Sequence, residues 1–150
     1  MSSYICLDTS VFVKLLVEEE DSDKASALMQ KVVRSRQLIV LPPFAWAEVG
    51  TVLRKKRRKN ELAIQEADDL WLEFRQFPGI EYLSDDAVMD RAYKISRYFD
   101  MPTLCDAAFL AVAEVVEEKT GEVCEFWTAD EKLVHSLNGK KQYVKLLEKR

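Results

Sequence analysis

Four acidic residues have the type and the spacing to do chemistry together: Asp8, Glu48, Asp106 and Asp130. Carboxylate oxygens bind hard divalent cations, and a bound cation can activate a water molecule for hydrolysis. The chain has a single histidine and three cysteines that lie far apart, so the nitrogen and sulfur ligands of zinc are scarce. A site built from these acids would therefore favour Mg²⁺ or Mn²⁺.

Two of the acids lie in apolar segments that make a partner necessary. Asp106 opens the apolar stretch 106–113, which we expect to be buried all round, and Glu48 lies in the similar stretch 44–49. No lysine or arginine lies within four residues of either. A buried carboxylate without a partner costs several kcal/mol, and two carboxylates about 4 Å apart repel by about 4 kcal/mol at an effective dielectric of 20. A divalent cation would remove both costs.

Each acid also has a purely structural interpretation. Asp8 and Asp130 could be helix N-caps, and Glu48 and Asp106 could favour the positive end of a helix dipole. The neighbouring hydroxyls could orient a carboxylate or a metal-bound water as an outer shell, and the two that directly follow Asp8 could instead cap a helix. These hydroxyl residues are Thr9, Ser10 and Thr128.

A run of six consecutive cations gives the second candidate site. The chain as a whole carries a formal net charge of −4, so the run concentrates positive charge in an otherwise acidic protein. It could contact nucleic-acid phosphates, remain solvated at a helix C-terminus, or meet an acidic partner. The six residues are Arg54, Lys55, Lys56, Arg57, Arg58 and Lys59.

The elements that must position these residues alternate along the chain. Five short apolar runs predict strands covered on both faces, and the segments between them have helical periodicity. Alternation of this kind predicts an α/β fold with a mainly parallel sheet of about five strands and helices on both faces, in one domain over residues 1–150. The expected strands are 4–7, 38–41, 80–83, 125–128 and 142–146, and the expected helices are 23–35, 42–59, 61–77, 86–99, 103–119 and 131–137.

Asp8 and Asp130 fall where a predicted strand ends and a helix begins. Glu48 falls in the second turn of the helix that follows the second strand, and Asp106 in the first turn of its helix. In an open parallel sheet the carboxyl ends of the strands share one edge, where ligands bind. We therefore expect the four acids to face one crevice.

The sequence lacks the residues that other classes of active site require. The single histidine, His135, lies among apolar residues where we expect a structural role, and no nucleophile elbow or glycine-rich phosphate loop is present. Three unpaired cysteines predict reduced thiols. No apolar run is long enough for a membrane span, so we expect a cytoplasmic protein with no membrane contact.

Four motifs resemble those of the PIN-domain ribonucleases, in particular the VapC-like toxins of toxin–antitoxin pairs. They occur in the order and at the spacing typical of that family, and together they span residues 7–133. The motifs are LDTSVFVKL (7–15), FAWAEVGTVLRK (44–55), LCDAAFLAVA (104–113) and FWTADEKL (126–133).

This resemblance implies a three-layer α/β/α sandwich with Asp8, Glu48, Asp106 and Asp130 as the acidic site, Asp130 being the most variable position in the family. It also implies a Mg²⁺- or Mn²⁺-dependent ribonuclease acting on RNA, a homodimer and an antitoxin protein that inhibits it. Two alternatives stay open: a housekeeping PIN nuclease without an antitoxin, and a catalytically silent, Mg²⁺-binding receiver-like module that would use Asp85 or Asp86 after the third strand.

Overall fold

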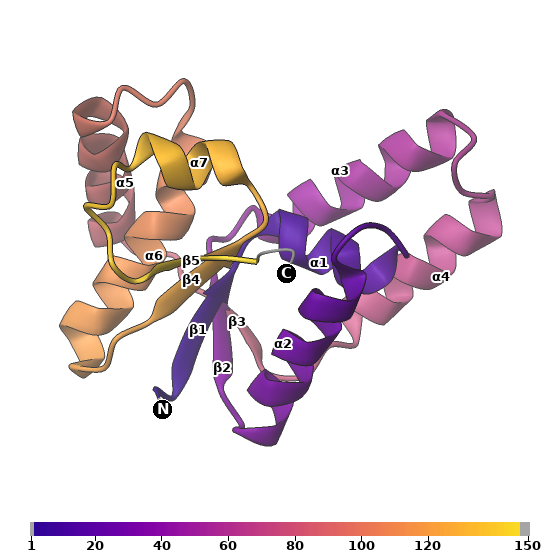
Figure 1. Cartoon of the computed structure of the whole chain (residues 1–150), viewed down its shortest axis with the longest axis horizontal. Helices are drawn as coiled ribbons and strands as arrows, with labels where there is room; N and C mark the ends of the chain where they lie inside the picture. The colour runs from indigo at the N-terminus through magenta and orange to yellow at the C-terminus, as the bar shows by residue number, and fades with distance from the viewer. Residues whose placement is uncertain (1, 148–150) are drawn as a thin grey trace.

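One five-stranded sheet lies at the centre of the protein, which we describe from a computed structural model over residues 2–147 (Figure 1). All four strand pairings are parallel, and the spatial order is β3-β2-β1-β4-β5. The expected α/β fold with about five strands is therefore confirmed. The strands are β1 (Tyr4–Leu7), β2 (Leu38–Leu41), β3 (Ile80–Tyr82), β4 (Glu125–Thr128) and β5 (Val144–Leu146).

Helices cover both faces of the sheet and complete a three-layer sandwich (Figure 1). Helices α1 to α4 form one lobe, and α5 and α6 form another on the other side of the sheet. The helices are α1 (Thr9–Leu16), α2 (Ser22–Arg34), α3 (Ala45–Arg58), α4 (Ile64–Arg75), α5 (Asp86–Tyr98), α6 (Leu104–Thr120) and α7 (Glu131–Ser136).

Helix α6 is the central helix of its layer because nearly every side chain in its first half is small or apolar. Residues 107–113 are all buried, and the helix contacts β1, β2 and β4. Alanines at four of these seven positions allow a close approach to the sheet. Phe109 fills the remaining space against Phe44 and Phe126, with ring centroids 6.0 and 5.8 Å away. This packing fixes the first turn of α6, where Asp106 lies, above the end of β1.

On the opposite face, aromatic side chains join α1 to the α3–α4 pair. The ring of Phe12 in α1 meets that of Phe74 in α4 edge to face, with centroids 5.3 Å apart, and both are fully buried. Helix α3 lies against α4 at Gly50, where an added Cβ would come within 3.1 Å of the Trp71 ring. The two helices project from the sheet as an arm (Figure 1).

The structure corrects two of the sequence-based expectations and supplies the bounds of one further helix. Helix α3 begins at Ala45 rather than at the two prolines. His135, expected among core residues, is exposed. Helix α1 is a full element of eight residues, although its periodicity alone did not delimit it.

Within residues 2–147, no helix has both the length and the apolar character needed to cross a membrane.

Candidate active site

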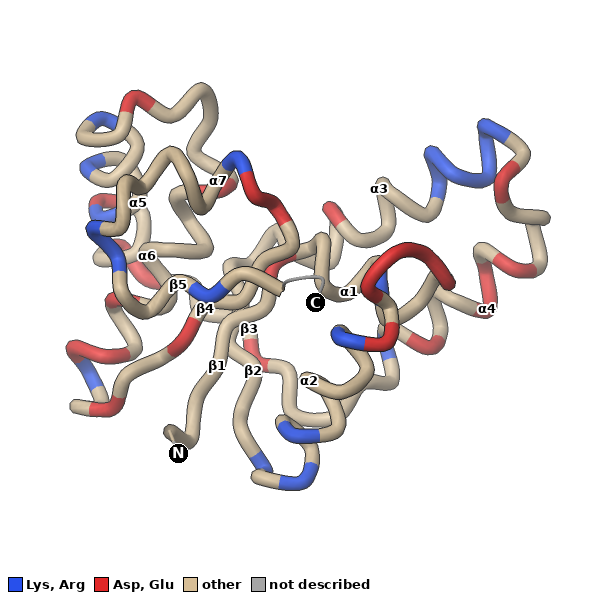
Figure 2. The backbone as a smooth tube through the Cα atoms, in the orientation of Figure 1, with Lys and Arg blue, Asp and Glu red and all other residues tan. Residues whose placement is uncertain are grey.

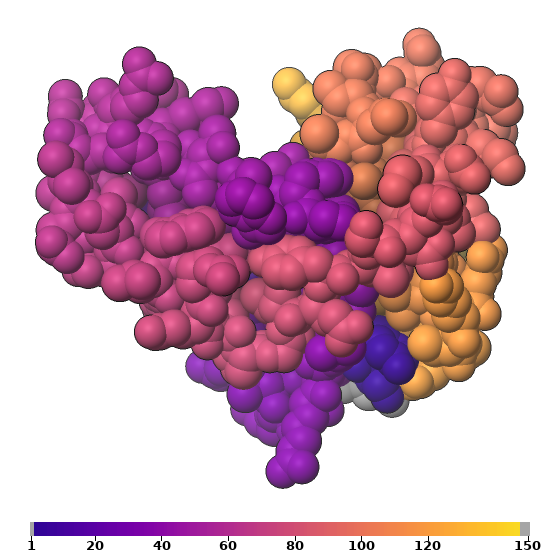
Figure 3. Space-filling view, turned by 180° about the vertical axis from the view of Figure 1, so that it is seen from behind, coloured from indigo at the N-terminus to yellow at the C-terminus, as the bar shows by residue number. Residues whose placement is uncertain are grey.

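The crevice for a ligand lies at the carboxyl ends of β1 and β4. The chain leaves β1 toward β2, whereas β4 pairs with the other edge of β1, so the direction of winding reverses between these two strands. In open α/β sheets such a reversal leaves a crevice outside the strand ends. Viewed from behind, the molecule has a notch between the α3–α4 lobe and the α5–α6 lobe (Figure 3).

Asp8 is the buried carboxylate of this crevice, with only 8% of its surface exposed. It follows β1, and its backbone N–H donates to the carbonyl of Trp127 at 2.9 Å, which ties it to β4. Oδ2 accepts hydrogen bonds from Thr128 Oγ1 at 2.7 Å and Ser10 Oγ at 2.9 Å, and Oδ1 accepts from the Thr9 N–H at 2.9 Å. Three donors from two elements therefore fix its orientation.

Burial raises the pKa of Asp8, and the negative charge of Asp130 adds to the rise, while the hydrogen bonds from Thr128, Ser10 and Thr9 oppose it. The pKa stays above the ordinary value for an aspartic acid. The three donors therefore do not fully compensate the loss of water around this carboxylate. A positive charge in the crevice would complete the compensation.

Glu48 is brought to the same crevice by α3 and is half-buried. Its Oε1 accepts a hydrogen bond from Thr9 Oγ1 at 2.8 Å, so Thr9 links two acids through its backbone and its side chain. Burial raises the pKa of Glu48, and the charges of Asp8 and Asp106 raise it further. The Cys105 thiol also lies close enough to hydrogen-bond to Glu48.

Asp106 lies in the first turn of α6 and is half-buried. In the described part of the chain its carboxylate has neither a hydrogen bond nor an ion pair, unlike that of Asp8. Burial raises its pKa, and the charges of Asp8 and Asp130 add to the rise. The expectation that α6 would bury Asp106 on all sides is therefore wrong, because the helix starts at the rim of the crevice and only the residues after Asp106 pack inside.

Asp130 caps α7, as its structural interpretation expected. Its Oδ1 accepts hydrogen bonds from the backbone N–H groups of Lys132 at 3.0 Å and Leu133 at 3.2 Å, and the side chain is exposed. Its charge nevertheless contributes to the raised pKa of both Asp8 and Asp106. Asp130 is thus at the edge of the acidic crevice with one carboxylate oxygen already engaged.

The chemistry of these donors fits a hard divalent cation. Four carboxylates interact through their charges, and no lysine or arginine in residues 2–147 forms an ion pair with any of them. The oxygens have not converged on one point, since no group of three or more acidic, cysteine or histidine side chains among the described residues is arranged to hold a metal ion. The crevice therefore has the charge of a cation site without the finished geometry.

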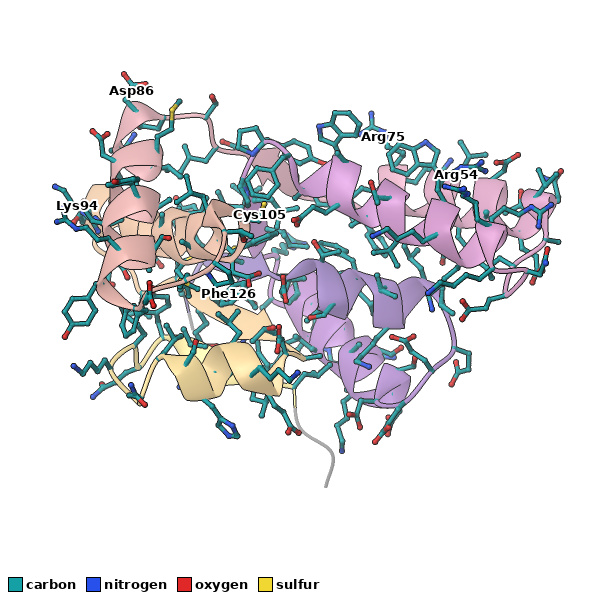
Figure 4. All side chains as sticks on the ribbon, turned by 90° about the horizontal axis from the view of Figure 1, so that it is seen from above. Arg54, Arg75, Asp86, Lys94, Cys105 and Phe126 are labelled. Carbon is teal, nitrogen blue, oxygen red and sulfur yellow. The ribbon has the colours of Figure 1, made fainter. Side chains whose placement is uncertain are left out.

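Cys105 is a crevice residue that the sequence did not indicate. It precedes Asp106 and is largely exposed, and its pKa is raised by the partial burial of the thiol and by the charges of Glu48 and Asp106. Figure 4 shows it in the middle of the molecule, between the two lobes. Its position directly before an acid was the available signal, but an isolated cysteine in an apolar segment is more often a core residue.

The six cations lie at the far end of α3, away from the sheet (Figure 2). Two of them have structural partners. Lys56 pairs with Glu19 at 3.8 Å and Glu61 at 3.9 Å, and Arg57 donates to Asn60 at 3.1 Å. Three others, Arg54, Lys55 and Arg58, line a groove of about 540 Å³ between α3 and α4.

Two solved structures have a similar fold. A toxin–antitoxin complex from Klebsiella pneumoniae contains a chain with a TM-score of 0.67 to this one at 16% identity, covering 97% of this chain and 99% of that chain. A VapC toxin of Mycobacterium tuberculosis that cleaves the sarcin–ricin loop has a TM-score of 0.57 at 18% identity, covering 88% and 94%. At these identities the likeness shows the fold alone.

No curated protein sequence matches the chain. The sequence model of the PIN domain, however, matches residues 5–135, which include all four acids and the strands and helices that place them. The chain belongs to the PIN domain family.

Proposed function

We propose that the protein is a Mg²⁺- or Mn²⁺-dependent endoribonuclease, formed by one PIN-like domain over residues 1–150. The observation that carries the proposal is the crevice between β1 and β4, where three acids have raised pKa values and no basic residue of the described chain is paired with them. Family membership supports it, as does the likeness in fold to a chain of a toxin–antitoxin complex and to a VapC toxin. The receiver-like alternative is rejected, because the chain belongs to the PIN family and Asp85 caps α5.

In this proposal Asp8 and Asp106 hold the cation, with Glu48 as a further ligand directly or through water and Asp130 at the rim. Thr128, Ser10 and Thr9 keep Asp8 and Glu48 in place through their hydrogen bonds. When bound, the ion would neutralise charge on the scissile phosphate and make a water molecule more nucleophilic. With its one histidine exposed on α7, the chain has no pair of imidazoles for an acid–base route through the RNA 2′-hydroxyl.

We further propose that the protein is the toxin of a toxin–antitoxin pair and forms a homodimer in the cytoplasm. The toxin–antitoxin complex of K. pneumoniae supports an antitoxin partner by its similar fold. Large apolar side chains on the surface, among them Trp46, Leu72, Met89 and Leu104, are each about half exposed or more and support contacts with protein partners. A housekeeping PIN nuclease would share the crevice, and an antitoxin reading frame beside the gene distinguishes the two.

The nuclease proposal is tested by incubating purified protein with RNA in the presence of Mn²⁺. We expect cleavage by the wild-type protein, and a loss of about a hundredfold or more in Asp8→Asn, because the change removes the buried ligand. Asp85→Asn is the matched control, since Asp85 caps α5 and pairs with Lys119 outside the crevice. Equal cleavage by the wild-type and Asp8→Asn proteins, or cleavage undiminished by EDTA, would refute the proposal.

A further inference from the structure

A second basic surface, separate from the run on α3, surrounds a cavity between α5 and the loop that precedes β5. The cavity has a volume of about 540 Å³. Five cations and a single carboxylate line it, in a chain whose net charge is −4. Its polar lining consists of Arg91, Lys94, Arg97, Tyr98, Glu114, Lys140 and Lys141.

The single carboxylate is already neutralised. Glu114 forms ion pairs with Arg91 at 3.1 Å and Lys141 at 2.8 Å and accepts a hydrogen bond from the Tyr143 hydroxyl at 2.5 Å. Burial raises the pKa of Glu114, but the hydrogen bonds from Lys141 and Tyr143 outweigh this effect and hold the pKa below its ordinary value. The carboxylate is therefore ionised, and its negative charge is balanced by the two ion pairs. The positive charge of the other lining residues is therefore not offset inside the cavity.

Three cations of the cavity remain available to an anion. Lys94 and Arg97 are exposed on α5, three residues apart, and neither side chain has a hydrogen bond or an ion pair within residues 2–147. Lys140 donates to the Tyr98 hydroxyl at 2.8 Å and lies over the Tyr98 ring, 5.0 Å from its centroid. This interaction holds an ammonium group beside the cavity without neutralising it.

The cavity and the α3 run lie at opposite ends of the molecule. Figure 4 shows Lys94 at one end and Arg54 at the other, with Cys105 of the acidic crevice between them. A polyanion is repelled by an acidic protein except where positive charge is concentrated. An RNA that reaches the crevice thus meets positive charge on both sides of it.

We propose that the cavity lined by Lys94, Arg97 and Lys140 binds phosphates of the RNA backbone, so that the substrate is an RNA long enough to extend from the acidic crevice to α5. The inference rests on the proposed ribonuclease function. Phosphate contacts of this kind position the RNA and carry no base specificity. An acidic protein partner would carry negative charge, as RNA does, and would be attracted to the same cavity. A measurement of RNA binding distinguishes the two occupants.

The test measures binding of a fluorescently labelled RNA hairpin by anisotropy over a series of salt concentrations. All proteins in this test carry Asp106→Asn, which is expected to prevent cleavage, and RNA binding can be measured whether or not the nuclease proposal holds. We expect Lys94→Ala/Arg97→Ala to weaken binding about tenfold and to reduce the slope of log K against log salt by about two, roughly one for each phosphate that is no longer neutralised.

Lys31→Ala/Arg34→Ala is the matched control. These two residues have the same types and the same spacing, are exposed in the last turn of α2, and lie at the amino end of the sheet, far from the crevice (Figure 1). We expect them to leave affinity and slope almost unchanged. An equal loss of affinity in both pairs would show a general effect of net charge and would overturn the proposal.

Several further results would also overturn it. Unchanged RNA binding in Lys94→Ala/Arg97→Ala, or no RNA binding by any variant, would show that the cavity does not hold RNA. If the same variant binds RNA normally but has a weaker affinity for the antitoxin, the cavity belongs to a protein partner. Cleavage of RNA by the wild-type protein combined with an unchanged salt slope would reject this inference alone and leave the nuclease function standing.

Discussion

At the scale of single residues, the carboxylates of Asp8 and Asp106 differ in the hydrogen bonds that they accept. Both carboxylates have raised pKa values, mainly through burial. Asp8 has three hydrogen-bond donors, whereas Asp106 has none from the described chain. Removing the charge of Asp8 would leave donors without an acceptor, but removing that of Asp106 relieves repulsion and breaks no hydrogen bond.

Asp106→Asn is therefore expected to stabilise the metal-free protein at neutral pH. A group whose pKa is raised in the folded state stabilises the fold below its unfolded pKa, and this contribution is lost as the pH rises through the folded pKa. The wild type should thus gain stability on mild acidification from pH 7 toward the unfolded value of 3.8, and the variant should gain less. Thermal melting in EDTA measures this.

At pH 7 we expect a rise in Tm of about 2–4 °C for each ~1 kcal/mol of repulsion relieved. The difference between the two proteins should disappear near pH 4. Glu114→Gln is the opposite case, because Glu114 forms two ion pairs and its replacement should lower the Tm at pH 7. A lower Tm for Asp106→Asn at pH 7 would show that its charge is compensated in a way this structure does not contain.

At the scale of elements, the α3–α4 arm depends on the absence of a side chain at one position. Gly50 lets the Trp71 ring lie against α3. We expect Gly50→Leu to separate the two helices and to lower the free energy of unfolding by about 1–3 kcal/mol, the usual cost of overpacking. Thr51→Leu is the matched control on the same helix, because Thr51 is exposed. Urea unfolding compares the two, and equal midpoints would mean that Trp71 moves aside freely.

The elements themselves were largely predictable. Continuous apolar runs such as 4–7 and 38–41 identified buried parallel strands, because a strand covered on both faces needs no polar alternation. Helix α1 was harder, since its residues Val11, Phe12 and Val13 are buried on successive positions and leave no period to detect. The start of α4 was also missed, since the helix expected from residue 61 begins at Ile64, because the residues that join it to the basic run are compatible with helix or loop.

The site was predictable in its members but not in its contacts. Topology placed four acids at one sheet edge, and the structure brings their charges within reach of one another. The sequence favoured Glu48 and Asp106 as the buried acids, but Asp8 is the most buried because β4 and α1 enclose it. That enclosure depends on the pairing of residues 7 and 127, far apart in the chain, which local patterns do not encode.

At the scale of the whole molecule, the acidic crevice couples metal binding to folding. A cation that binds only the folded chain raises stability with concentration, by about 2.7 kcal/mol when its concentration is a hundred times its Kd. We expect the Tm to rise with Mn²⁺, to return on addition of EDTA, and to be unaffected by KCl at equal ionic strength. Asp106→Asn should lose most of the rise. A Mn²⁺ response of equal size in Asp106→Asn would place the cation elsewhere.

The middle position of β1 sets an order of events during synthesis. Asp8 is made 120 residues before Thr128, which donates to it, and almost as long before Trp127, which accepts from its backbone. Until β4 has been made, Asp8 lacks the strand that encloses it on one side, and α6 lacks part of the sheet against which it packs. Domains generally fold as units, so a nascent chain that still lacks β4 displays no assembled crevice. Whatever activity the crevice has thus begins only after β4 has been made.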